Sequence, residues 1–191
     1  MSKKESDKLI KLIKSLKLTP KTLHEPMFKG NEVKYLKDCI KTGYVSSIGQ
    51  YVKKFEEKII NLTKSKYAVA VVNGTAALHL SLDIIGVDQG DEVLTQSLNF
   101  VASTNAIHQC KATPVFIDVS KETLGMCPDS LSSFLEKECT LTNVGCMNKK
   151  TKRIVKACIP MHTFGFPCSI KEIKEICMKY NIKLVEDAAE S

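Results

Sequence analysis

An apolar run that ends in Asn-Gly-Thr is the first place where this chain could bind a ligand. Gly74 and Thr75 follow the segment Tyr67–Val72 and open a stretch with helical periodicity. A glycine there lets backbone N–H groups approach an anion at a helix N-terminus, where the helix dipole favours negative charge, and Thr75 adds a hydroxyl donor. The pattern suits a phosphate monoester, and it has neither the lysine of a P-loop nor the three glycines of a dinucleotide-binding turn. The alternative is a tight turn with Thr75 near the helix cap.

A second candidate is a carboxylate at the end of the last apolar run. Asp187 follows Ile182–Glu186 and precedes two alanines, Ala188 and Ala189. This arrangement combines an anion with room for a flat group to lie close to the backbone. An aspartate paired with a pyridine nitrogen keeps that nitrogen protonated and so strengthens the ring as an electron sink. The alternative is that Asp187 caps a following helix.

Two further side chains follow apolar runs. Phe100 comes after the run that includes Glu92–Thr95 and could stack on an aromatic cofactor ring, although a single phenylalanine is more often part of a core. His162 follows Ile154–Pro160 and could contact substrate. A buried histidine with satisfied hydrogen bonds is at least as good an interpretation of His162.

The elements that would position these residues alternate between strands and helices. We expect strands over Tyr67–Val72, Glu92–Thr95, Thr113–Asp118, Ile154–Pro160 and Ile182–Glu186. We expect helices over about 30–42, 51–62, 75–85 and 101–108, one beginning near Pro128 with Asp129 as its cap, and one opening at a capping box, Ser169 to Glu172. The fold class is therefore α/β, with a mainly parallel sheet covered by helices on both faces. Ligands bind such sheets beyond the carboxyl ends of the strands, where all four candidates lie.

Composition narrows the class of protein. The 191 residues carry a net charge of +7, but the lysines are scattered and only Asn148–Arg153 forms a cluster, so nucleic-acid binding is not indicated. The eight cysteines form no Cys-x-x-Cys pair, which favours free thiols in a reducing compartment, a cytoplasmic location and no metal site. No apolar run is long enough to span a bilayer, so we expect no membrane partner. Met1–Lys17 is typical of an amphipathic helix and not of a signal peptide.

Taken together and in this order, the motifs resemble the DegT/DnrJ/StrS sugar aminotransferases from about Phe28 to the end of the chain. The resemblance rests on the segments 43–49, 55–56, 73–79, 114–118, 162–165 and 186–191. It is closest to the LegC-type branch, which aminates UDP-linked 4-keto-6-deoxy-N-acetylhexosamines. The cues for this branch are Asn148–Arg153 and the ending Glu190-Ser191.

The resemblance implies the large domain of a type I PLP-transferase fold, with pyridoxal 5'-phosphate (PLP) as the cofactor. By position, Gly74 and Thr75 would hold the phosphate, Phe100 would stack on the ring, and Asp187 would pair with the pyridine nitrogen. Ala189 would line the opposite ring face, and Glu190 stands where relatives often contact the ring hydroxyl. The implied substrate residues are Ser46, Ser47, Gly49 and His162. The resemblance also implies a homodimer, a nucleotide-linked keto sugar as substrate, and an amino-acid donor, in this family generally glutamate, that supplies the new 4-amino group.

The same resemblance implies that the chain is incomplete. We expect a leader over residues 1–27 and a C-terminally truncated large domain over 28–191, because the family's Schiff-base lysine follows the Asp-Ala-Ala segment. No catalytic lysine is then assigned within the chain, and the chain alone should be inactive. Two alternatives stay open. One is an inactive half-domain that acts in binding or assembly, and the other is a sugar dehydratase of the same scaffold, in which a histidine replaces the lysine.

Overall fold

The computed structural model describes residues 3–16 and 26–191, which fall into two units, Met1–Ala70 and Val71–Ser191. The Lys17 end of the expected leading helix lies outside the described residues. None of the described helices is long and apolar enough to cross a membrane.

The first unit consists of helices α1 (Lys3–Ser15), α2 (Glu32–Thr42) and α3 (Gln50–Thr63), and none of their residues is buried. Helix α2 ends where Gly43 adopts a left-handed conformation with φ of 77°, which glycine reaches without strain. Asp38 of α2 accepts hydrogen bonds at 3.0 Å from Gln50 Nε2 and from Tyr51 Oη, and so joins the two helices. The expected helices over 30–42 and 51–62 are confirmed.

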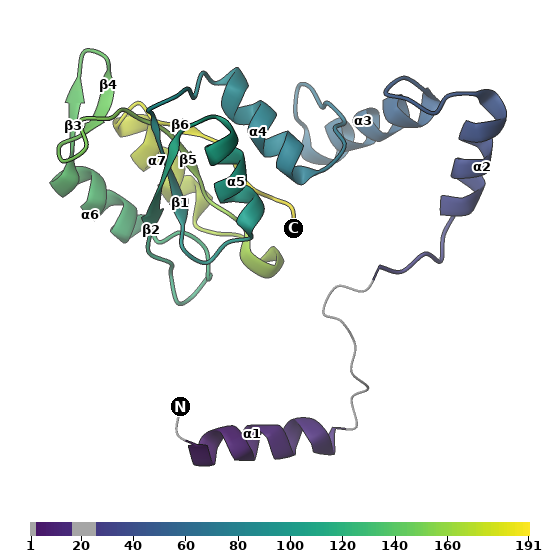
Figure 1. Ribbon diagram of the computed structural model, residues 1–191, viewed down its shortest axis with the longest axis horizontal. Coiled ribbons are helices and arrows are strands. Elements are labelled where there is room, and N and C mark those ends of the chain that lie inside the picture. The colour runs from purple at the N-terminus through teal and green to yellow at the C-terminus, as the bar shows by residue number, and fades with distance from the viewer. Residues whose placement is uncertain (1–2, 17–25) are drawn as a thin grey trace. The chain divides into compact units, whose positions relative to one another are not determined.

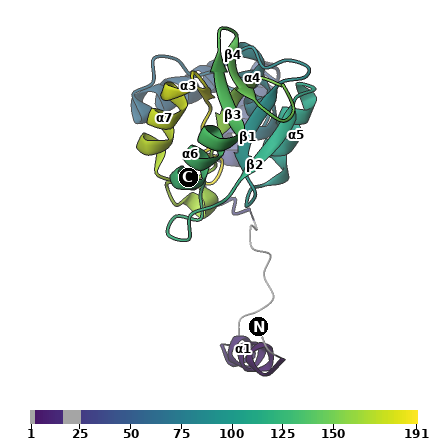
Figure 2. The same ribbon diagram turned by 90° about the vertical axis from the view of Figure 1, so that its left-hand side faces the viewer.

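The second unit is built on a four-stranded parallel sheet in the order β2-β1-β5-β6 (Figure 1). Its strands are β1 (Glu92–Gln96), β2 (Thr113–Ile117), β5 (Val155–Ile159) and β6 (Lys183–Leu184). Its helices are α4 (Gly74–Ile84), α5 (Val101–Gln109), α6 (Pro128–Glu138) and α7 (Ile170–Lys179). Figure 2 shows α5 on one side of the sheet and α7 on the other. The expected parallel α/β sheet, covered on both faces, is confirmed.

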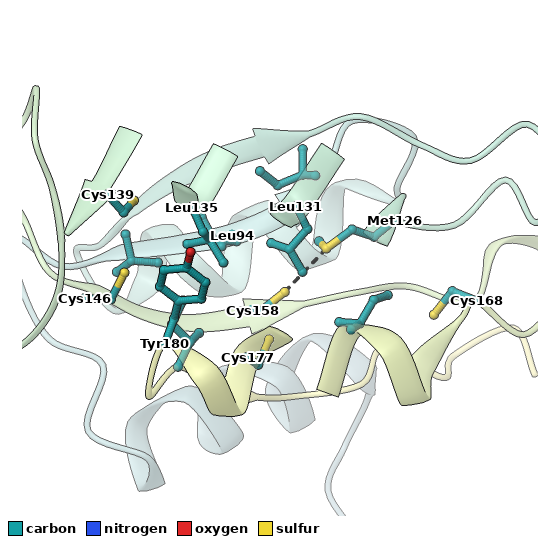
Figure 3. Close-up of a cluster of buried hydrophobic side chains, with 14 residues drawn as sticks. Leu94, Met126, Leu131, Leu135, Cys139, Cys146, Cys158, Cys168, Cys177 and Tyr180 are labelled. Carbon is teal, nitrogen blue, oxygen red and sulfur yellow. Dashed lines mark hydrogen bonds between the residues drawn. The ribbon is translucent and has the colours of Figure 1, made fainter. Parts of the chain in front are cut away.

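Each face of the sheet has its own apolar core. Leu94 and Cys158 contribute to the core beneath α6 and α7, which is drawn in Figure 3. Val93 and Ile159 point to the opposite face and contribute to the core beneath α4 and α5. Successive strand residues alternate between faces, and the buried runs of β1 and β5 therefore supply both cores.

The expected strand over Tyr67–Val72 is wrong. These residues form no strand, and Val69 and Val72 are 71% and 89% exposed. Their β-branched, apolar composition favours a strand, but a strand needs hydrogen bonds from a neighbour. Within residues 3–16 and 26–191 no segment supplies them.

The expected cap of α6 is wrong, and the expected capping box of α7 does not form, although α7 begins where it was expected. Helix α6 begins at Pro128, as expected, but its N-cap is Cys127, two residues before the expected cap, and Asp129 lies inside the first turn. Ser169 is the N-cap of α7, but its side chain makes no capping hydrogen bond, so the capping box is not formed. Proline at the first helical position has no N–H that needs an acceptor, and its fixed φ favours the start of α6.

A β-hairpin formed by β3 (Cys139–Thr142) and β4 (Gly145–Asn148) was not predicted from the sequence. Asn148 Nδ2 of this hairpin donates a 2.8 Å hydrogen bond to the buried carboxylate of Glu92, at the start of β1. The hairpin therefore covers the amino edge of the sheet and leaves the carboxyl edge free for a site.

Candidate functional site

The carboxyl ends of β1, β5 and β6 meet at one edge of the sheet. The segments that follow β5 and β6 stay paired with each other. Asp187 N donates to Pro160 O at 2.9 Å, and His162 N donates to Asp187 O at 3.1 Å. Met161 and Asp187 form an isolated parallel bridge. This pairing fixes the backbone of Asp187 at the strand ends.

Asp187 carries a buried carboxylate, with only 4% of the residue exposed. Its Oδ2 accepts a 2.6 Å hydrogen bond from Ser103 Oγ, and its Oδ1 accepts one of 3.3 Å from Ala189 N. Among the described residues, no lysine, arginine or histidine lies within ion-pair distance of it. A buried carboxylate without a cation is costly, and its two oxygens have lone pairs left for a further donor.

Ser103 is a site residue that the sequence analysis missed. It lies one helical turn after Phe100 in α5, and its N–H donates to Phe100 O at 3.1 Å. Residues three apart on a helix share a face, so the spacing Phe100–Ser103 was a usable signal.

Phe100 is the N-cap residue of α5, in an extended conformation at the end of the β1 connection. Its N–H contacts Met161 Sδ at 3.4 Å, and 65% of the residue is exposed. The structure therefore brings Phe100, Ser103 and Asp187 together, and Phe100 is exposed to solvent.

The N-terminus of α4 is directed to the same edge. Helix α4 ends at Ile84, and the turn after it, where Val87 N donates to Leu82 O at 3.0 Å, leads back to the start of β1. An 11-residue helix is about 16 Å long, close to the length of a five-residue strand. Gly74 is therefore placed toward the strand ends.

The cap of α4 is Asn73, and Thr75 lies two residues after it. Asn73 Oδ1 accepts from Ala76 N at 2.8 Å, and the first intrahelical bond runs from Ala77 N to Asn73 O. The N–H groups of Gly74 and Thr75 precede that bond and point out of the helix end. A Cβ added at Gly74 would meet nothing within 4 Å. This end of α4 thus offers open space and unoccupied donors, as an anion site requires.

His162 is buried, and both of its ring nitrogens have partners. Nδ1 accepts a 3.2 Å hydrogen bond from Cys168 N, and Nε2 lies 3.3 Å from Glu186 Oε2. Burial raises the pKa of the neighbouring Cys168 thiol, which lies 3.3 Å from Nδ1. This geometry favours the interpretation of His162 as a satisfied buried histidine that holds its loop in place.

Glu190, the residue after the alanine pair, makes close contacts with the loop that follows β5. Glu190 Oε2 accepts a 2.6 Å hydrogen bond from Phe164 N. Gly165 has a φ of 81°, and a Cβ there would come within 2.8 Å of Glu190 O. Glu190 therefore fixes the loop after β5, while Ala189 is exposed beside Asp187.

Gln96, at the last position of β1, was also missed by the sequence analysis. Its Oε1 accepts from Met126 N at 2.9 Å and from Met161 N at 3.0 Å, and its Nε2 donates to Leu98 O and Thr163 Oγ1 at 2.8 Å. One buried amide thus connects three loops at the carboxyl edge. A single glutamine in an apolar run gives no sequence signal for such a role.

The expected substrate residues Ser46, Ser47 and Gly49 lie in the first unit. Ser46 and Gly49 line a hollow of about 280 Å³ between the end of α2 and the start of α3. The segment also carries Tyr44 and Ile48, which line the same hollow.

Ser103 allows a test of the site that does not depend on function. Ser103→Ala removes the hydroxyl from the buried Asp187 carboxylate, and hydrogen bonds to charged groups contribute roughly 1.5–3 kcal/mol. We expect the free energy of unfolding, measured by urea titration of the 191-residue chain, to fall by about that amount. Thr104→Ala is the control, because Thr104 Oγ1 bonds only to Val101 O of its own helix. Equal losses for the two variants would contradict the assigned contact.

Comparisons with known proteins identify the family of the chain. The sequence profile of the DegT/DnrJ/EryC1/StrS aminotransferase family matches residues 26–191. The chain belongs to this family. Its members use PLP, and the fold is the α/β fold of the PLP-dependent aminotransferases.

Individual relatives place the chain in the N-terminal part of such proteins. A GDP-perosamine synthase of Vibrio cholerae is 38% identical over 169 residues, which are 88% of this chain and 42% of that protein. An aminotransferase from Psychrobacter cryohalolentis has a similar structure, with a TM-score of 0.74 and 29% identity over 90% of this chain and 40% of its own. A chain described as a sugar aminotransferase from Streptococcus pneumoniae, solved in its PMP form, has a TM-score of 0.68 and 25% identity over 84% of this chain and 36% of its own. The chain thus spans about two-fifths of the family members that it matches.

Proposed function

We propose that this chain supplies the cofactor-binding half of an enzyme that transaminates a nucleotide-linked 4-keto-6-deoxy hexose or N-acetylhexose to the 4-amino sugar. The observation that carries the proposal is the buried carboxylate of Asp187, which has a hydroxyl donor in Ser103 and no cation partner among the described residues. A protonated pyridine ring is both a cation and a hydrogen-bond donor, so it would supply the cationic partner that the Asp187 carboxylate lacks.

The surrounding residues fit the rest of PLP. The free N–H groups of Gly74 and Thr75 and the dipole of α4 suit its phosphate, and the open ring of Phe100 suits stacking. Ala189 leaves space on the other ring face. Bound PLP accepts an amino group and returns it, and it withdraws electrons through the protonated ring. Asp187 keeps that ring nitrogen protonated, and Ser103 keeps the Asp187 carboxylate oriented.

The substrate class rests on the resemblance and on the relatives. The name GDP-perosamine synthase supports a nucleotide-linked amino sugar as the product. We assign substrate contacts to Ser46, Ser47 and Gly49, and a supporting role to His162. An amino acid, with glutamate as our choice, supplies the amino group. We further propose that the complete enzyme is a cytoplasmic homodimer and that its cofactor-binding lysine is supplied by the part of the enzyme that this chain does not span.

The first test is cofactor binding by the chain itself. We expect the 191-residue chain to bind PLP weakly and reversibly, and to bind pyridoxal, which lacks the phosphate, more weakly still. Gly74→Ala should reduce the preference for PLP over pyridoxal, because its methyl group enters the space proposed for the phosphate without touching protein atoms. Absorbance titrations measure both affinities, and Thr75→Ser, which keeps the hydroxyl, is the control. Equal affinities for PLP and pyridoxal in the wild-type chain would contradict the phosphate site.

The second test is activity. The chain alone should show no amination of a nucleotide-linked ketosugar, because none of its lysines is assigned to the cofactor. Turnover by the 191-residue chain would overturn the assignment of the lysine to the rest of the enzyme. The alternative of an inactive binding or assembly module would be supported if the complete protein were inactive too.

A further inference from the structure

Helix α1 lies outside the residues that match the aminotransferase family, which begin at residue 26. Its sequence separates apolar from basic residues around the helix axis. At 100° per residue, Leu9, Ile10, Leu12, Ile13 and Leu16 fall on one side. Lys3, Lys4, Lys8, Lys11 and Lys14 fall on the other side. Glu5 falls on the apolar side as well, near the N-terminal end of the helix, so the apolar face extends from Leu9 to Leu16.

The apolar face is open along its whole length. Leu9, Ile10, Leu12 and Ile13 are 46–56% exposed, and no residue of α1 is buried. They follow the i, i+3, i+4 spacing of a helix that buries one side. A stripe of this kind, rimmed by charges, marks a surface that is covered in use.

The charge of α1 indicates which kind of partner covers its apolar face. Helix α1 contains five lysines and two acidic residues, Glu5 and Asp7, so the helix has a net charge of +3. Residues 1–25 hold seven of the 28 basic and three of the 21 acidic residues, so residues 26–191 are also positive, with 21 basic and 18 acidic residues. The net charge of residues 26–191 therefore gives α1 no electrostatic attraction to the rest of this chain or to a second copy of it. The surface of an anionic lipid bilayer offers acyl chains to the apolar side of α1 and negatively charged headgroups to its lysines.

We propose that α1 lies in the headgroup region of an anionic membrane, with Leu9, Ile10, Leu12 and Ile13 inserted and the lysines at the lipid phosphates. The expectation of no membrane partner came from the absence of a spanning run. Such a run is needed to cross a bilayer but not to lie on its surface. The helix would hold the enzyme at the membrane without taking part in the chemistry.

Flotation of the full chain with lipid vesicles tests the proposal. We expect binding to vesicles of phosphatidylglycerol and phosphatidylcholine in equal amounts and little binding to phosphatidylcholine alone. The double variant Lys8→Glu, Lys11→Glu should lower the partition coefficient by at least about tenfold, because each lysine near an anionic surface adds on the order of a fivefold gain. The matched control is Lys171→Glu, Lys174→Glu, an exposed pair with the same spacing on α7. The control should bind as the wild type does.

A second pair of variants tests the apolar face. Leu9→Ser, Ile13→Ser should abolish flotation, whereas Leu62→Ser, Val144→Ser, which removes two apolar side chains that are even more exposed, should not. Gel filtration of the same proteins without lipid tests a second copy as the partner. Equal binding to both vesicle types, absence of binding, or loss in both control pairs would overturn the proposal. So would self-association that depends on Leu9 and Ile13 in a chain that ignores vesicles.

Discussion

Asp187→Asn in the full-length enzyme should lower the rate of sugar amination by roughly 10²–10³-fold, the loss typical of removing one electrostatic stabiliser from an active site. An amide occupies nearly the same volume as the carboxylate and still accepts the hydrogen bond from Ser103 Oγ. It carries no charge, however, and so does not keep the pyridine nitrogen protonated. The fold should survive, because the backbone bonds of Asp187 to Pro160 and His162 do not involve its side chain.

Single-turnover amination of a nucleotide-linked ketosugar measures the loss. The control is Glu186→Gln, which neutralises the adjacent, exposed carboxylate that contacts His162. We expect Glu186→Gln to keep most of the rate. Near-normal turnover in Asp187→Asn, or an equal loss in both variants, would mean that the wrong carboxylate has been assigned to the ring nitrogen.

Gly125→Ala should strongly destabilise the second unit. A Cβ at Gly125 would lie 2.6 Å from Cys168 Cβ and 3.3 Å from Met161 O, so the loop before α6 would have to move. Overpacking of this kind typically costs about 1–3 kcal/mol. The displaced loop carries Met126, whose N–H bonds to Gln96, so the carboxyl edge would loosen as well.

Urea unfolding of the 191-residue chain measures this cost. Gly74→Ala is the matched control, because its methyl group meets nothing within 4 Å, and it should leave stability unchanged or slightly higher. Cys168→Gly in the Gly125→Ala background removes the clashing atom and should recover part of the loss. A Gly125→Ala chain as stable as the Gly74→Ala chain would refute the contact.

The parallel sheet was predictable because its signals are local. The apolar runs at β1, β2 and β5 alternate with amphipathic helices, and this order alone favours a doubly covered parallel sheet. The C-cap of α2 was equally readable, since Gly43 ends the helical pattern. Elements that depend on partners were not predictable. Tyr67–Val72 has the composition of a strand, but pairing requires a neighbouring strand that the described residues lack.

The candidate site also combines residues that local sequence patterns locate with contacts that only the fold reveals. The positions of Asp187 and Phe100 follow from strand ends, which sequence patterns locate well. Two other contacts of the site depend on tertiary packing. Ser103 bonds to Asp187, which is 84 positions away, and the side-chain amide of Gln96 bonds to Met161, which is 65 positions away. His162 illustrates the opposite case. Its place at a strand end was predicted, but its buried contacts with Cys168 and Glu186 become visible only in the fold.

The protonation state of the cofactor ring tests the central claim most directly. Nitrogen-15 NMR of the full-length enzyme, loaded with PLP labelled at the pyridine nitrogen, reports whether that nitrogen carries a proton. We predict a protonated nitrogen in the wild-type enzyme and an unprotonated one in Asp187→Asn, with Glu186→Gln unchanged from the wild type. An unprotonated ring in the wild-type enzyme, or a protonated ring in Asp187→Asn, would contradict the assignment of Asp187 to the cofactor.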